Sequence, residues 1–267
     1  MPLKIKFKVF FIIVIYLAVL FCVQSFFGLI ASFVYSALGV YFLYRIYPQF
    51  DIHSDIRFDN TKKQVCLTFD DGPTQEFTES ILKILKDKNV TASFFVIGIK
   101  AKTNLDIIKR TILQGCEVGA HTVNHKKLHN YSYSKIAAEI EPVIKDIQQV
   151  YSEIGKPKDF KKIFRAPHGF KNISLKIFLA SNCIKLIPWT RGVWDTDAPG
   201  SDEILKRATV KPKRNEILLL HDGLGLNDAS EQQKKGILEA LPRIIDFYKT
   251  NGYVFVKASS YLRDDRR

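Results

Sequence analysis

The sequence predicts an α/β fold with a parallel sheet or barrel, preceded by a separate apolar segment. From residue 64 onward, short apolar runs alternate with amphipathic stretches, which is typical of strands that alternate with helices. Before that point, residues 9–44 contain no charged residue. The chain has 267 residues, of which 46% are hydrophobic, so it can build a substantial core and general disorder is excluded.

Residues 1–50 are expected to form a membrane anchor. Lysines precede the uncharged stretch and no acidic residue occurs in this segment, which predicts a cytoplasmic N-terminus. As one straight helix the uncharged stretch would measure about 54 Å, longer than the roughly 30 Å hydrocarbon core of a bilayer. We therefore expect either two transmembrane helices, about Val9–Val23 and Phe26–Tyr44, or one helix followed by an interfacial stretch. An integral membrane protein is predicted, and the side that its catalytic domain faces stays open.

Three further segments follow this predicted anchor. Residues 51–63 are polar and of mixed charge, and indicate a linker. Residues 64–262 are expected to form one catalytic domain, and residues 263–267 a charged tail. The net charge of +13 favours a basic surface near anionic lipid or glycan. No nucleic-acid partner is expected, because the basic residues are scattered and no recognition motif occurs.

The elements of the predicted domain alternate along the chain. Seven strands are expected, which fit an incomplete barrel of the TIM type: Val65–Phe69, Ser93–Ile97, Glu117–Ala120, Lys162–Phe164, Ile184–Pro188, Glu216–Leu220 and Tyr253–Val256. The amphipathic stretches predict helices at Gln75–Lys88, Leu105–Gln114, Tyr133–Tyr151, Ser174–Ser181, Asp202–Thr209 and Glu231–Lys249. In such folds the chemistry lies where strands end and loops begin, so polar residues at those points are the candidates for a site.

The first polar group is Asp70-Asp71, which follows an apolar strand and precedes Gly72-Pro73. Neighbouring residues on an extended chain point in opposite directions, so the two carboxylates can serve two roles. Adjacent carboxylates repel, and they are tolerated where one binds a cation or pairs with an arginine. The alternative is a simple turn that ends the strand, because Asp-Gly-Pro is strong turn chemistry.

The second group places His121 and His125 four residues apart, with His129 extending the series. On a helical turn the first two share a face and can reach one metal ion. Together with one of the two aspartates they make a site of two histidines and one carboxylate, with open positions for water and substrate. The alternative is a solvated, histidine-rich loop.

Two more strand ends carry ionisable residues. Arg165 follows a short strand and can hold a carboxylate in a bidentate pair, although an ordinary surface arginine is the alternative. His221 follows an apolar strand, and an imidazole there titrates near neutrality, which suits a general acid. Asp195 is a candidate to orient it. The alternatives are a core histidine with satisfied hydrogen bonds and an aspartate that caps a helix.

Taken together, these stretches resemble the polysaccharide deacetylases of the NodB-homology group, carbohydrate esterase family four. The resemblance covers residues 65–262, and the motifs that carry it are LTFDDGP, HTVNH, FRAPHG and LLLHDG. It implies a distorted (β/α)7 TIM-like barrel of the NodB type. It also implies a metal-dependent hydrolase that removes N-acetyl groups from an amino-sugar-containing glycan.

The resemblance implies a role for each matching residue. Asp70 looks like the general base, steadied by Arg165. Asp71, His121 and His125 look like the ligands of one divalent metal, with Zn²⁺ as the default ion and Co²⁺ or another divalent ion as alternatives. His221 looks like the general acid, tuned by Asp195. The remaining roles are the oxyanion donor, carried by the backbone amide of His168, and the pocket for the acetyl methyl group, formed by Leu219 with Trp189 nearby.

This sequence departs from the family pattern at three points. Ala120 stands where an asparagine commonly precedes the first metal histidine, and Ala166 replaces a common second proline. The fourth motif is WDTD, so Asp197 competes with Asp195 as the partner of His221. Two alternative functions stay open: an inactive sugar-binding homologue anchored in a membrane, and a deacylase of a lipid-linked sugar.

Overall fold

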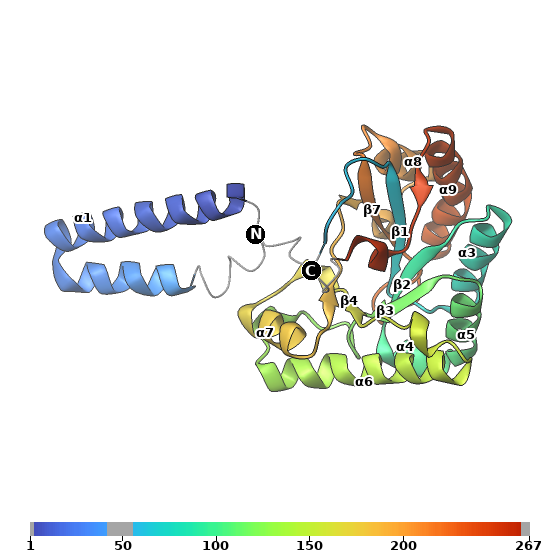
Figure 1. The fold of residues 1–267 in the computed structure, drawn as a ribbon, viewed down its shortest axis with the longest axis horizontal. Helices are drawn as coiled ribbons and strands as arrows, with labels where there is room; N and C mark the ends of the chain where they lie inside the picture. Colours follow the sequence, from blue (N-terminus) through green and yellow to red (C-terminus); the bar gives the residue numbers. More distant parts are fainter. Residues whose placement is uncertain (1–2, 42–55, 263–267) are drawn as a thin grey trace.

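The computed structural model describes residues 3–41 and 56–262 (Figure 1). The strands are β1 (Gln64–Asp70), β2 (Ala92–Val96), β3 (Glu117–Ala120), β4 (Ile163–Phe164), β5 (Lys185–Leu186), β6 (Arg191–Gly192), β7 (Asn215–His221) and β8 (Val254–Phe255). The α-helices are α1 (Leu3–Tyr41), α3 (Gln75–Asp87), α4 (Gly98–Thr103), α5 (Leu105–Leu113), α6 (Tyr133–Glu153), α7 (Ile173–Ser181), α8 (Ser201–Thr209) and α9 (Glu231–Thr250).

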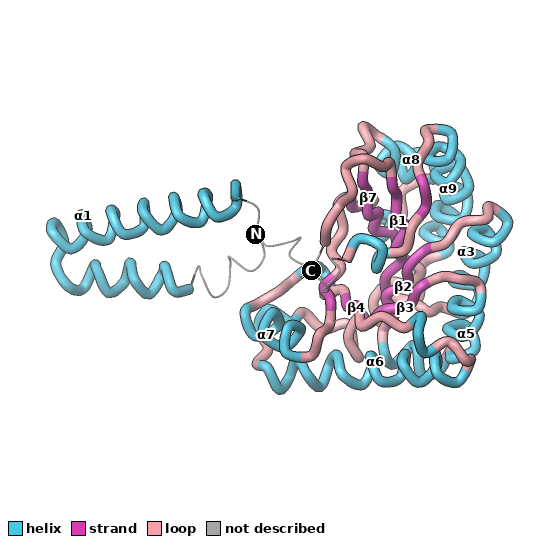
Figure 2. Tube along the Cα trace, in the orientation of Figure 1, coloured by secondary structure: helices cyan, strands magenta, loops and turns pink. Residues whose placement is uncertain are grey.

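The strands form one parallel sheet in the order β5-β4-β3-β2-β1-β7-β6, with β8 pairing to the first residues of β1. These strands pair in parallel, so the carboxyl ends of neighbouring strands lie at one edge. In Figure 2 the long helices follow one outer side of the curved sheet. The architecture is a parallel-strand half-barrel. It confirms the predicted α/β class, and β5 and β6 form the two ends of the sheet path.

Alternation along the strands separates an outer layer from the interior of the half-barrel. On β1, Val65, Leu67 and Phe69 pack in the large core beneath the helices, whereas Cys66 packs in a second, interior cluster. Since successive side chains of a strand face opposite sides, Asp70 shares the interior face with Cys66. The same rule applied to β7 places His221 on the face of Ile217, which belongs to the interior cluster.

Most predicted elements have a counterpart within a few residues. The amphipathic stretch at Gln75–Lys88 forms α3, which buries Phe77, Ile81 and Leu85 at helical spacing. Among the strands and α-helices of the barrel domain, two were not predicted. β6 consists of Arg191 and Gly192 alone and therefore shows no apolar run, and α4 is only six residues long.

The predicted membrane anchor is corrected by the structure. Within the described part of the chain, no helix combines the length and the apolar character needed to cross a bilayer. The helix α1 is interrupted at Gly28, where φ is 72° and ψ is −171°. The chain folds back there (Figure 1), and the rings of Tyr16 and Tyr35 stack with centroids 5.0 Å apart. The prediction of an integral membrane protein is therefore wrong, and binding to membrane lipid is not shown.

The two ends of the barrel domain meet. Ile56 forms an antiparallel bridge with Leu262, and Phe58 packs edge-on against Tyr261 with ring centroids 5.0 Å apart. These residues pack in the interior cluster, beside Cys66 of β1 and Ile217 of β7. The rest of the expected linker before residue 56, and the tail expected at 263–267, lie outside the described residues.

Candidate active site

A cavity of about 470 Å³ opens at the carboxyl ends of the strands. Most of the residues singled out from the sequence line it: Asp70, Asp71, His121, His125, His168, Trp189, Leu219 and His221. The other two, Arg165 and Asp195, are wholly buried behind its wall. The parallel sheet therefore brings together side chains that are as much as 151 residues apart along the chain, such as Asp70 and His221, whose Cα atoms are partners in the register of β1 and β7.

Asp70 and Arg165 form a buried ion pair in the cavity wall. Arg165 Nη1 donates to Asp70 Oδ1 at 2.8 Å, and both side chains are almost inaccessible to solvent. The arginine does not engage the other carboxylate oxygen, Asp70 Oδ2, which lies 3.8 Å from His121 Nε2. A charged hydrogen bond to one oxygen holds the carboxylate in a defined orientation, with its second oxygen beside the histidines.

The Arg165 side chain is itself held on several sides. Nη1 also donates to Thr68 Oγ1 at 2.7 Å, while Nε and Nη2 donate to the carbonyls of Ile187 and Pro188. Its guanidinium lies over the ring of Phe95, 4.2 Å from the centroid. A buried arginine costs free energy unless its donors and charge are satisfied, and here the surrounding groups satisfy them.

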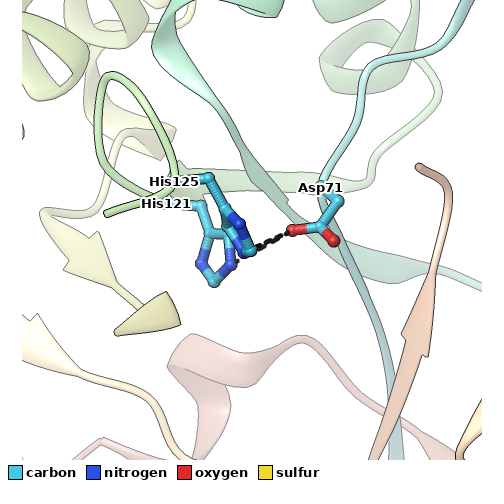
Figure 3. Close-up of side chains that lie close together, drawn as sticks. All are labelled: Asp71, His121 and His125. Carbon is cyan, nitrogen blue, oxygen red and sulfur yellow. Dashed lines mark ion pairs between the residues drawn. The ribbon is translucent and has the colours of Figure 1, made fainter. Parts of the chain in front are cut away.

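Asp71, His121 and His125 form a cluster whose ligand atoms all lie within 4.8 Å of one another (Figure 3). Asp71 Oδ1 is 3.0 Å from His125 Nε2 and 3.4 Å from His121 Nε2. This oxygen is buried and has no hydrogen-bond partner in the described structure. A divalent metal ion suits this arrangement of two imidazole nitrogens and one buried carboxylate oxygen that accepts no hydrogen bond. The donor set therefore fits the expected cofactor.

Two opposing effects act on the pKa of Asp71. Burial acts to raise the pKa of its carboxyl, but the contacts with His121 and His125 outweigh burial and hold the pKa below its ordinary value. Outside the donor set, the Asp71 Oδ2 atom accepts a hydrogen bond from the backbone N–H of Gly225 at 2.7 Å. A backbone group also orients His121: its Nδ1 lies 2.9 Å from the carbonyl oxygen of Arg165. Such outer contacts fix the directions of metal ligands.

Five non-glycine residues at or beside the site have left-handed backbone conformations. The φ angles are 76° at Asp71, 65° at Thr122, 54° at His125, 55° at His168 and 58° at Trp194. L-residues adopt this region at a cost on the order of 1 kcal/mol each. The surrounding fold therefore imposes this backbone geometry, and all of these residues except Thr122 line the cavity.

His221 is bound twice by Asp195. Its Nδ1 lies 3.0 Å from Asp195 Oδ1, and its backbone N–H donates to Asp195 Oδ2 at 2.9 Å. Burial acts to lower the pKa of His221, but the Asp195 carboxylate outweighs burial and raises the pKa to about 9. Asp197 instead lies outside this contact, 66% exposed and 3.9 Å from Arg207. Of the two aspartates left open by the sequence, the structure places Asp195 against the imidazole.

The remaining predicted residues form the apolar side of the cavity. Trp189 and Leu219 both line it, and the Trp189 ring lies close to Gly169: a Cβ added there would come within 2.8 Å of the indole. The ring of His168 lies 4.8 Å from that of His125. Burial, with the nearby charges of His125 and Lys127, lowers the pKa of His168.

Several lining residues were not singled out from the sequence. Trp194 stands 65% exposed at the rim, and the segment from Leu224 to Asn227 lies along the cavity. Within this segment Gly225 contributes its backbone N–H to Asp71, and a Cβ at Gly225 would meet the His125 ring at 3.1 Å. Any residue type can donate a hydrogen bond from its backbone, so the sequence does not reveal the contact with Asp71. The glycine is the one sequence feature consistent with the close approach of the backbone to His125.

Comparisons with known proteins agree with this architecture. A family model described as polysaccharide deacetylase matches residues 58–181. A peptidoglycan-N-acetylglucosamine deacetylase of Bacillus cereus is 30% identical over 209 residues, which cover 76% of this chain and 90% of that protein. The chain belongs to the polysaccharide deacetylase family. The resemblance drawn from the motifs is thereby confirmed, as is the enzyme class, carbohydrate N-deacetylase.

Other relatives of this polysaccharide deacetylase extend the comparison. A chitooligosaccharide deacetylase of Sinorhizobium fredii is 30% identical over 195 residues, 71% of this chain and 87% of that protein. The crystal structure of a peptidoglycan N-acetylglucosamine deacetylase superposes with a TM-score of 0.68 at 27% identity, covering 80% of this chain and 93% of that chain. A family pseudoenzyme from Bacillus anthracis superposes with a TM-score of 0.66 at 25% identity, covering 77% of this chain and 67% of that chain. Since a pseudoenzyme has the same fold, the fold by itself does not establish activity, which depends on the residues of the site.

The departures from the family pattern leave the site geometry intact. Ala120 is the last residue of β3 and is buried, and its carbonyl oxygen accepts the Arg165 backbone N–H at 3.0 Å. Ala166 is also buried, between Arg165 and the turn that contains His168. Neither alanine displaces a member of the donor set in this polysaccharide deacetylase.

Proposed function

We propose that this polysaccharide deacetylase is an active, metal-dependent enzyme that removes N-acetyl groups from a glycan containing N-acetylglucosamine. One observation carries the proposal. The Asp70–Arg165 pair and the His221–Asp195 pair stand at one cavity together with the Asp71, His121, His125 cluster. Amide hydrolysis needs an activated water, a stabilised oxyanion and a proton for the departing amine, and this cavity has a candidate for each.

Asp70 is the proposed general base. Arg165 holds Oδ1 of the carboxylate, so the second oxygen is left to take a proton from water on the cavity side. Arg165 has no access to the cavity and acts only through Asp70. The charged hydrogen bond from the arginine fixes the direction of the carboxylate, as a general base requires.

Asp71, His121 and His125 are the proposed ligands of one divalent ion, Zn²⁺ in the first instance, with Co²⁺ or another ion as alternatives. When bound, such an ion lowers the pKa of a coordinated water and polarises the amide carbonyl. The backbone amide of His168 is the proposed second donor to the oxyanion. The left-handed conformation of His168 turns its peptide group away from the regular direction of the chain.

His221 is the proposed general acid. Its Nδ1 is occupied by Asp195, so the proton for the leaving nitrogen comes from Nε2. The raised pKa of about 9 keeps the ring protonated at neutral pH, as an acid requires. Leu219 and Trp189 provide the apolar wall against which the acetyl methyl group would pack.

The two alternative functions are less well supported. An inactive sugar-binding homologue would not need a buried arginine for Asp70 or a charged partner for His221, yet both are present. A lipid-linked sugar presents the same acetamide, but the named relatives act on peptidoglycan or chitooligosaccharides.

Acetate release by the purified protein tests the proposal. The zinc-loaded enzyme should release acetate from N-acetylated chito-oligomers or peptidoglycan, and the Asp70→Asn and His125→Ala variants should be slower by at least about 100-fold. A lipid-linked N-acetylglucosamine serves as the second substrate. Release from that substrate alone would favour the alternative, and equal rates in native enzyme and variants would refute the assigned roles.

A further inference from the structure

A buried carboxyl group lies directly behind the site and has no part in the chemistry described so far. Asp222 follows His221 at the end of β7 and is 1% exposed. Its backbone N–H donates to the carbonyl oxygen of Asp70 at 3.0 Å. Its side-chain Oδ2 accepts a hydrogen bond from the hydroxyl of Thr78, on α3, at 2.7 Å. Asp222 therefore joins the end of β7 to β1 and to α3.

The Asp222 carboxyl also packs against the turn that carries the two catalytic aspartates. A Cβ added to Gly72 would lie 2.0 Å from Asp222 Oδ2 and 2.5 Å from Oδ1. Nothing larger than glycine fits between this carboxyl and the turn. The position of the residue directly after Asp71 is thus set by contact with Asp222.

The hydrogen bonds around this contact form a chain. The backbone N–H of Thr74 donates to Thr78 Oγ1 at 2.8 Å, and the Thr78 hydroxyl donates onward to Asp222. Lys100 on α4 supports the turn as well, since its Nζ donates to the carbonyl oxygen of Asp71 at 3.0 Å. The segment from Asp70 to Thr74 is therefore held by contacts on its peptide groups, away from the cavity.

We propose that Asp222, fixed by Thr78, is a positioning residue that sets the location of Asp70 and Asp71 relative to His221. The inference rests on the proposed function, because it gives Asp222 a part in that same reaction. Asp222 does not touch substrate or metal, and it acts through the Asp70–Thr74 turn. Displacement of a reacting group by about 1 Å can cost on the order of 100-fold in rate, so such a contact has a measurable effect.

Two pairs of variants separate the size of the side chain from its charge and hydrogen bond. Asp222→Asn keeps the volume and an acceptor for Thr78, whereas Asp222→Ala removes both. Thr78→Ser keeps the hydroxyl, whereas Thr78→Val removes it. Thr111→Val is a matched control, because Thr111 is a buried helical threonine on α5 whose hydroxyl bonds within its own helix, to Ile107.

The experiment measures kcat, KM and the zinc dissociation constant of each variant, together with the folded fraction. We expect kcat to fall about 10- to 100-fold and zinc affinity to weaken about tenfold in Asp222→Ala and Thr78→Val, as for other groups that orient metal ligands. KM should stay within about threefold. Asp222→Asn and Thr78→Ser should recover most of both losses, and Thr111→Val should match the native enzyme.

Three results would overturn the proposal. One is a folded Asp222→Ala variant with native kcat and native zinc affinity. Another is an Asp222→Asn variant as impaired as Asp222→Ala, which would mean that the charge matters and not the position. The third is a loss of activity that only follows the loss of folded protein. Zinc affinity is measured without substrate, so the proposal can be tested even if the native enzyme releases no acetate and the proposed function fails.

Discussion

Asp195 binds both the ring and the backbone of His221, through Oδ1 to Nδ1 at 3.0 Å and through Oδ2 to the amide nitrogen at 2.9 Å. One carboxylate thus sets the charge of the imidazole and its direction. This contact predicts how the rate depends on pH. Asp195 raises the pKa of His221 to about 9, above the ordinary imidazole value, and the proposed general acid must carry its proton to react. Activity should therefore be retained at neutral pH and lost as the pH rises through about 9.

The Asp195→Asn variant should move that alkaline limit toward neutral pH. Without the carboxylate, burial lowers the pKa of His221 unopposed, so the ring loses its proton at a lower pH. At pH 8 we expect kcat to fall at least about tenfold, with a smaller loss at pH 6. A pH–rate profile measures this, and Asp197→Asn is the control, since Asp197 is exposed and lies near Arg207. An unchanged alkaline limit in Asp195→Asn would contradict the assigned pair.

Substitution of Arg165 should affect rate and stability together. Arg165→Lys keeps the positive charge but cannot reproduce the contacts with Asp70, Thr68 and two carbonyl groups at once. We expect kcat to fall about 10- to 100-fold in this variant. Arg165→Ala leaves Asp70 buried without its partner and should lower the free energy of unfolding by about 3–5 kcal/mol. Urea denaturation and steady-state kinetics measure the two effects, and native kcat in a folded Arg165→Lys variant would refute the role given to the arginine.

Metal removal should abolish activity reversibly. Dialysis against a chelator should leave folded protein that releases no acetate, and added Zn²⁺ should restore the rate. In His125→Ala the donor set loses one nitrogen, so zinc affinity should fall by at least about tenfold. His129→Ala is the control, because that ring lies against Phe170, with centroids 5.0 Å apart, and is no member of the cluster. Equal zinc affinity in the two variants would remove His125 from the ligand set.

Gly169 gives a test of the apolar wall. Its φ is 74°, and a Cβ there would come within 2.8 Å of the Trp189 ring, so Gly169→Ala should displace the indole and reduce kcat/KM several-fold. Gly155 has nearly the same φ, 73°, with no atom within 4 Å of an added Cβ. Gly155→Ala therefore carries the backbone cost alone, about 1–2 kcal/mol. Thermal unfolding should show a loss of stability in both variants, larger in Gly169→Ala because of the added clash, while kinetics should change only in Gly169→Ala. A kinetic change in both would argue against a role for Trp189.

Much of the site could be predicted because parallel strands place their carboxyl ends at one edge. Asp70, His121, Arg165 and His221 each stand at or just beyond such an end, so apolar runs ending in ionisable residues located them together. The choice between Asp195 and Asp197 could not be made in the same way. These two residues share one short helical turn, and only its orientation decides which of them meets the imidazole.

Other features left no readable pattern in the sequence. The N–H of Gly225 acts through the backbone, and the position of Asp222 beside Gly72 depends on packing between segments 150 residues apart. The expected membrane anchor rested on the absence of charge over residues 9–44. Its two-helix version placed a break between Val23 and Phe26, and the structure has the break at Gly28. Patterns of residue type thus identified the chemistry of this enzyme better than they identified the supports behind it.

Because the site holds strained, left-handed residues, metal binding should also affect thermal stability. Asp71 and His125 are held at φ 76° and 54°, so unfolding releases strain there that opposes the folded state. An ion that binds only the folded chain counters this by mass action, adding about 2.7 kcal/mol at a free concentration 100 times its dissociation constant. The melting temperature of this polysaccharide deacetylase should then rise with the concentration of free zinc. A low zinc concentration would reduce both the stability of the fold and the catalytic activity.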